Sequence, residues 1–128
     1  MVRNWVIFEG RPNRRDRDRA RVTLNRKGIF LLNKAAFEEL KRPEAVRLMF
    51  NPANQTIGLA ATRLDRENAF PVKTKDKYSN RIVLAGPFCK HFGITVETTV
   101  LFNGITTDRD GVLILELSET TVIGRGGH

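Results

Sequence analysis

The chain alternates short apolar stretches with clusters of turn-forming residues, a pattern typical of proteins built mainly from β-strands. Polar and apolar residues alternate over 21–24 (RVTL), whereas 29–32 (IFLL) is continuously apolar. Pro71 makes 69–72 an edge strand, because proline cannot donate to a strand ladder. The same pattern predicts further strands at 5–8, 46–50, 56–60, 81–84, 99–102 and 112–117.

Two short helices are predicted between these strands. The first covers 34–41: Asn33 can accept a hydrogen bond from an unpaired N–H at its start, and Pro43 ends it. The second begins at Gly86-Pro87, with proline in the first turn, and Gly93 ends it. The predicted inward-facing residues are Ala36, Phe37 and Leu40 in the first helix and Phe88 and Phe92 in the second.

Residues 29–61 and 81–117 resemble one another, which indicates an internal repeat. A shift of 52 positions places Leu32 on Leu84 and Leu40 on Phe92, and the closing strands match at a shift of 55. We therefore predict one domain, 1–128, with strand–helix–hairpin repeats at about 20–61 and 69–117. The expected fold is mostly β with a minor α+β character, a small β-barrel with approximate two-fold symmetry. We expect 118–128, which ends in GRGGH, to be a disordered tail.

The bulk composition limits the class of protein. A chain of 128 residues with 41% hydrophobic and 28% charged residues is ordinary for one globular domain. It contains no apolar run long enough to span a bilayer and no signal-peptide cleavage pattern at its start. Its single cysteine cannot form an internal disulfide. We therefore expect a cytoplasmic protein without membrane association.

The net charge of +8 is spread unevenly along the chain. Residues 1–27 contain nine Lys or Arg against three Asp or Glu, and residues 62–81 contain six against three. Both basic segments precede a predicted helix. Such clustering attracts polyanions, so nucleic acid is the expected partner, although each cation can also be an ordinary solvated surface charge.

The predicted repeat unit resembles the AbrB-type swapped-hairpin domain of bacterial transcription regulators and antitoxins. The resemblance rests on RIVLAGPFCKHFGI and DGVLILEL in the second copy and on RKGIFLLNKAAFEELKRPEAV in the first, where Arg42-Pro43 stands in place of the usual glycine. Two units in one chain resemble the MraZ-type members, whose tandem copies form one pseudo-dimeric barrel. The resemblance covers about residues 20–117 and implies DNA binding by cations around the opening strands.

The positions that match this implied binding surface form two sets. They are Arg21, Arg26 and Lys27 in the first unit, and Lys73, Lys75, Lys77 and Arg81 in the second. Arginine can bridge O6 and N7 of guanine, and lysine can neutralise phosphates. The charged loop before the first unit can follow the DNA backbone or enter a minor groove, through Arg11, Arg14, Arg15, Arg17 and Arg19.

Two other functions use the same charge. Tyr78 lies among cations and can stack an unpaired base, which allows a barrel that binds single-stranded DNA or RNA, with Trp5 or Phe70 as further platforms. The basic loop can also dock an acidic protein, as in an antitoxin or assembly subunit, and a homodimer remains possible.

Catalysis and cofactor binding are not expected. Cys89 and His91 are two positions apart on a helix and point in different directions, so we interpret Cys89 as a small buried residue. Asp108, Asp110 and Gly111 lack the remaining ligands of a calcium loop and predict a hairpin turn instead. We therefore expect no metal site, no cofactor and no enzymatic activity.

Overall fold

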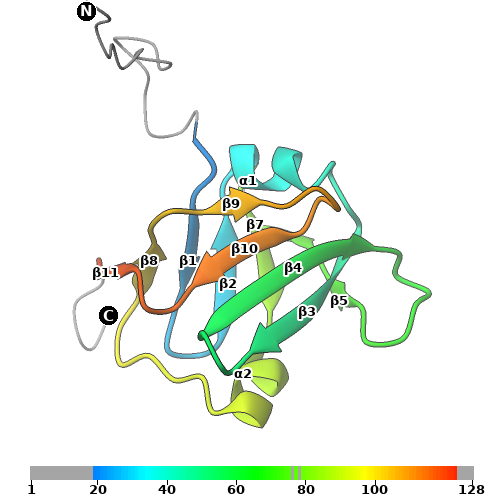
Figure 1. Cartoon of the computed structure of the whole chain (residues 1–128). Helices are drawn as coiled ribbons and strands as arrows, with labels where there is room; N and C mark the ends of the chain where they lie inside the picture. Colours follow the sequence, from blue (N-terminus) through cyan, green and yellow to red (C-terminus); the bar gives the residue numbers. More distant parts are fainter. Residues whose placement is uncertain (1–18, 76, 78, 124–128) are drawn as a thin grey trace, which may run out of the picture.

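The computed structural model describes residues 19–75, 77 and 79–123. Two antiparallel sheets form the framework of this part of the chain (Figure 1). The six-stranded sheet has the order β11 (Thr120–Val122), β8 (Val100–Phe102), β1 (Val22–Leu24), β2 (Ile29–Leu32), β7 (Arg81–Leu84), β6 (Lys73–Thr74). The five-stranded sheet has the order β5 (Phe70–Pro71), β3 (Ala45–Asn51), β4 (Thr56–Thr62), β10 (Leu113–Glu116), β9 (Thr106–Thr107).

The mostly-β prediction is therefore confirmed, but the strand pairing does not close the two sheets into one barrel. The predicted strand 5–8 and four of the predicted binding residues, Arg14, Arg15, Arg17 and Tyr78, lie outside the described residues, as does Arg11. Among the described residues, no helix is long and apolar enough to cross a membrane.

The core lies between the two sheets and follows the period-two alternation of their strands. Leu24, Phe30 and Val83 point into it from the six-stranded sheet, and each is fully or almost fully buried. The five-stranded sheet contributes Ile57, Leu59, Leu113 and Leu115, which are fully buried. In β10 the buried positions alternate with more exposed neighbours, as expected for a sheet with one buried face.

The two helices follow equivalent strands: α1 (Lys34–Glu39) follows β2, and α2 (Gly86–Phe92) follows β7. The predicted cap is confirmed, because Asn33 Oδ1 accepts a hydrogen bond from the backbone N of Ala36 at 2.9 Å. Gly93 ends α2 in the left-handed conformation, as predicted. However, α1 ends at Glu39 rather than Lys41.

Burial does not follow the predicted shift of 52 at every position. The shift pairs Leu32, which is 0% exposed, with Leu84, which is 43% exposed, and it pairs the buried Leu40 with the exposed Phe92. The two helices, however, begin at Lys34 and Gly86, which are 52 positions apart. The shift therefore matches the starts of the helices but not the buried face at each of these positions.

The predicted second hairpin, between 99–102 and 112–117, is also wrong. Strand β8 pairs with β1 and β11, whereas β10 pairs with β4 and β9. Residues after Phe102 leave the six-stranded sheet and enter the other sheet at β9. The prediction that 118–128 is a disordered tail is wrong for Thr120–Val122, which forms β11 and pairs with β8. Residues 124–128 lie outside the described part.

The connector between the two units also divides between the sheets. Strand β5 lies at the edge of the five-stranded sheet, as predicted for 69–72, and pairs with β3. Val72 alone separates it from β6, which pairs with β7 in the six-stranded sheet. Strand β6 therefore pairs with β7 as β1 pairs with β2, whereas β5, in the segment 69–72, lies in the other sheet.

Candidate nucleic-acid interface

Several of the predicted cations meet at one end of the six-stranded sheet, next to the start of α1. Leu32, the last residue of β2, lies opposite both Val22 and Arg81. Arg21 therefore leads into this end from one side, and Arg81 begins β7 on the other. Lys75 follows β6 in the turn that precedes Arg81. We call this the α1 end of the sheet.

The backbone of Arg19 and Arg21 is held in place by Asn33. Asn33 Oδ1 accepts a hydrogen bond from Arg21 N at 2.9 Å, and Asn33 Nδ2 donates to Arg19 O at 2.6 Å. The backbone N of Asn33 also donates to Arg21 O at 3.0 Å. The residue that caps α1 thus fixes the segment before β1 that carries both arginines. The sequence signals the cap, but it gives no sign of this second role.

Arg81 is held against α1 by an aromatic contact. Its guanidinium carbon lies 4.5 Å from the centroid of the Phe37 ring, within the range of a cation–π interaction. Arg81 Nη1 also donates to Asn80 O at 3.3 Å. Phe37, predicted to point inward, is only half-buried because it serves this contact. The side chain of Arg81 is therefore positioned rather than freely solvated.

Arg26 and Lys27 lie at the opposite end of the sheet. Both belong to the turn from β1 to β2, where Asn25 Oδ1 accepts hydrogen bonds from Lys27 N and Ile29 N, each at 3.0 Å. Strand β2 has four residues, so its length separates them from Arg21 by about 13 Å. The structure does not bring together the predicted set of Arg21, Arg26 and Lys27.

Five of the cations at the α1 end form no ion pair with a described residue. In this part of the chain the ion pairs are Arg42–Glu38 at 2.7 Å and Arg63–Asp65 at 3.1 Å, and both are exposed. Neither involves Arg19, Arg21, Lys73, Lys75 or Arg81. Lys34, the first residue of α1, adds an exposed cation that the charge pattern alone did not single out. We define the α1-end patch as Arg19, Arg21, Lys34, Lys73, Lys75, Lys77 and Arg81.

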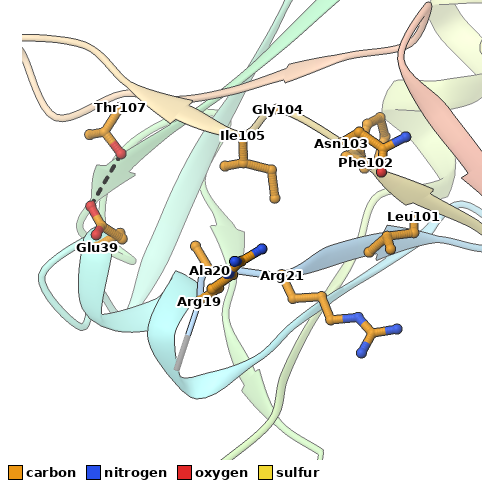
Figure 2. A pocket seen from close by; sticks show the side chains of 10 residues that line it. All are labelled: Arg19, Ala20, Arg21, Glu39, Leu101, Phe102, Asn103, Gly104, Ile105 and Thr107. Carbon is orange, nitrogen blue, oxygen red and sulfur yellow. Dashed lines mark hydrogen bonds between the residues drawn. The ribbon is translucent and has the colours of Figure 1, made fainter. Parts of the chain in front are cut away.

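A pocket of about 680 Å³ opens at the same end, between the start of β1 and the segment that joins β8 to β9 (Figure 2). On one side, Thr107 Oγ1 donates to Glu39 Oε2 at 3.2 Å and so links β9 to α1. The lining residues fall into an apolar group, Ala20, Leu101, Phe102 and Ile105, and a polar group that includes Arg19, Arg21 and Asn103.

The groups considered above for catalysis or metal binding have structural explanations. Cys89 is free and buried, and burial raises the pKa of its thiol. Asp108 Oδ1 accepts hydrogen bonds from the backbone N of Asp110 and Val112, at 2.8 and 2.9 Å, which is the predicted turn chemistry. Among the residues that the structure describes, no three His, Cys, Asp or Glu side chains cluster as metal ligands.

Comparison with known proteins adds no relative: no protein-family model, curated protein or solved structure matches the chain.

Proposed function

We propose that the protein binds double-stranded DNA without enzymatic activity and that the α1-end patch is its docking surface. The observation that carries this proposal is the set of cations that separate segments bring to one end of the sheet, where Arg21, Lys75 and Arg81 form no ion pair with a described residue. These segments are the start of β1, the start of α1, and β6 with the start of β7. A cluster of positive charges favours a polyanionic partner.

The dimensions of the patch suit a duplex. Arg21 leads into β1, and Lys75 follows β6. These two strands are three strand spacings apart in the sheet, or about 14 Å. The major groove of B-DNA is about 12 Å wide, so cations at the two sides can contact phosphates on both edges of a groove. Arg81, at the start of β7, lies between them and can reach base edges.

The AbrB-like resemblance remains part of this proposal. We propose that the two sheets act as one small barrel, because β5 and β6 are consecutive strands in different sheets, and so are β8 and β9. These two strand pairs would form the seams of the barrel. The resemblance would make the protein a regulator of transcription, and the single buried cysteine is consistent with a cytoplasmic location.

We favour a duplex over single strands because of the two aromatic residues, Phe70 and Tyr78, that were considered for stacking unpaired bases. Phe70 packs against the hydrophobic core, so it does not present a free ring for stacking. Tyr78, on which the single-strand hypothesis mainly depends, lies outside the described residues. Competition between duplex and single-stranded oligonucleotides separates the two hypotheses.

The decisive experiment measures duplex affinity by fluorescence anisotropy at two salt concentrations. With about five phosphate contacts, we expect affinity to fall roughly several hundred-fold between 50 and 200 mM salt. The triple variant Arg21→Gln/Lys75→Gln/Arg81→Gln should bind much more weakly and with a shallower salt dependence.

The matched control removes the same charge elsewhere. Arg47, Arg66 and Arg109 are exposed and lie outside the α1-end patch. Their triple substitution by Gln lowers the net charge equally and should leave most of the affinity. Equal losses in the two triple variants would reduce the effect to net charge and reject the patch. Undiminished binding at high salt would reject electrostatic docking altogether.

A further inference from the structure

The pocket at the α1 end exists because two paired strands separate. Strands β1 and β8 pair only through Thr23–Leu101 and Leu24–Val100. Beyond these pairs, β8 turns toward the five-stranded sheet, where β9 pairs with β10. The pocket lies in the gap between the diverging strands. Its volume of about 680 Å³ is within the range of about 300–1,000 Å³ that is usual for small-molecule sites.

The floor and the rim of this gap differ in chemistry. Phe102 is almost fully buried, and Ala20 and Ile105 pack against the core, so the floor is apolar and built into the fold. In Figure 2 the guanidinium of Arg19 extends toward the middle of the pocket, below Ile105, whereas Arg21 extends along its edge below Leu101. Neither arginine forms an ion pair with a described residue.

The backbone under both arginines is fixed, which lowers the entropy that a ligand must overcome. Asn33 bonds to the backbone of Arg19 and Arg21, as described above. At the far wall, Glu39 is held by Thr107 and brings a negative charge. A second anionic group on a ligand would be repelled there. The site therefore suits one anionic head next to an apolar body.

We propose that this gap binds a small organic monoanion, with its carboxylate or phosphate on Arg19 and Arg21 and its apolar body on Phe102 and Ile105. Both arginines also belong to the α1-end patch. A bound ligand would neutralise them and weaken DNA binding, so the gap would act as an effector site; this regulatory part rests on the proposed function.

The binding test uses the full chain without DNA. Phenylacetate and phenyl phosphate are titrated, with benzyl alcohol as the uncharged comparison, and the backbone amide of Gly104 in the pocket reports binding by NMR. We expect saturable shifts at Gly104 with at least one anion and affinity about tenfold weaker or more for the alcohol. The two anions distinguish a carboxylate from a phosphate ligand.

The matched variants remove one exposed arginine each. Arg19→Gln should weaken anion binding about tenfold or more, because it removes a charge-assisted contact, whereas Arg66→Gln, outside the pocket, should not change it. Absence of saturable shifts, or equal effects of the two substitutions, would overturn the site.

The regulatory part has its own readout. The anion that binds should reduce duplex affinity of the unmodified chain and should do so much less in Arg19→Gln. An anion that binds at Gly104 without changing duplex affinity would reject the effector role while leaving the site. Because the NMR titration contains no DNA, failure of the proposed DNA binding would leave its result intact.

Discussion

The backbone of Gly28 packs directly on that of Gly86. A Cβ on Gly28 would lie 2.8 Å from the Cα of Gly86, and Gly28 has a φ of +81°. The contact joins the β1–β2 turn to the start of α2, where Gly28 O accepts a hydrogen bond from Ala85 N at 2.8 Å. Both the conformation and the space at this position therefore require glycine.

We predict that Gly28→Ala lowers the free energy of unfolding by about 3 kcal/mol. Alanine is strained in the left-handed conformation, and its Cβ would displace the start of α2. Gly111 is a matched control, since it also has a φ of +81° but no atom within 4 Å of an added Cβ. Gly111→Ala should cost only about 1 kcal/mol. Chemical denaturation of both variants measures the difference, and equal losses would mean that the contact with Gly86 contributes nothing.

Features set by neighbouring residues were predictable from the sequence. Examples are the cap at Asn33, the left-handed Gly93, the hairpin between β3 and β4 and the turn at Asp108. Each depends on contacts within a few residues. The burial of Cys89 was also predicted correctly.

Features set by distant residues were not predictable in this way. Nothing near Val100 in the sequence shows that β8 pairs with β1, about 77 positions earlier, rather than with the closer β10. The choice is made by which pairing buries Val100 and Phe102 in the shared core. Likewise, Leu84 and Leu32 have the same residue type, and only the strand register shows that one faces solvent.

The same limit applies to the candidate site. The charge pattern identified Arg21, Lys75 and Arg81 as cations of interest, but grouped Arg21 with Lys27, which lies at the other end of β2. The pocket between β1 and β8 could not be predicted, because it follows from the non-local pairing of those two strands.

Asn33 should stabilise the fold through two segments at once. Asn33→Ala removes the cap of α1 and the hydrogen bonds to Arg19 and Arg21, so we expect a loss of about 2 kcal/mol. Asn33→Asp keeps an acceptor for Ala36 N and Arg21 N but loses the donor to Arg19 O, and should cost about 1 kcal/mol.

Denaturation measures these losses, and amide hydrogen exchange locates them. The Arg21 amide should exchange faster in Asn33→Ala and retain most of its protection in Asn33→Asp. If Arg21 exchange were the same in both variants and the native protein, Asn33 would act on the helix alone.

The end of α1 contains backbone strain that glycine would relieve. Lys41 and Arg42 have φ values of 66° and 53°, in the left-handed region that non-glycine residues rarely adopt. We predict that Lys41→Gly raises the free energy of unfolding by about 0.5 to 1 kcal/mol, after allowance for the greater freedom of the unfolded chain.

Lys90 is the control for this substitution, because it is exposed but lies within α2. Lys90→Gly should lower stability by about 1 kcal/mol. If the backbone at Lys41 is strained, thermal or chemical denaturation will show changes in unfolding free energy of opposite sign for the two variants. Two losses of similar size would contradict it.

The thiol of Cys89 should react slowly in the folded protein. It is 5% exposed, and burial raises its pKa above the ordinary value of a cysteine. Because only the thiolate attacks alkylating reagents, a higher pKa lowers the reactive fraction at neutral pH. We expect iodoacetamide to modify the native chain about tenfold more slowly, or slower still, than the chain unfolded in urea at the same pH. Equal rates would show that the helix opens readily around the thiol.

The same pKa shift makes the contribution of Cys89 to stability depend on pH. In the unfolded chain the thiol ionises at its ordinary pKa, whereas in the folded chain it stays protonated to a higher pH. Its contribution is therefore complete below the unfolded pKa and is lost as the pH rises toward the folded pKa. The difference in unfolding free energy between the native chain and Cys89→Ala should be constant from pH 6 to 8 and should shrink by pH 10. A difference that grew with pH would place the thiolate, not the thiol, in the folded core.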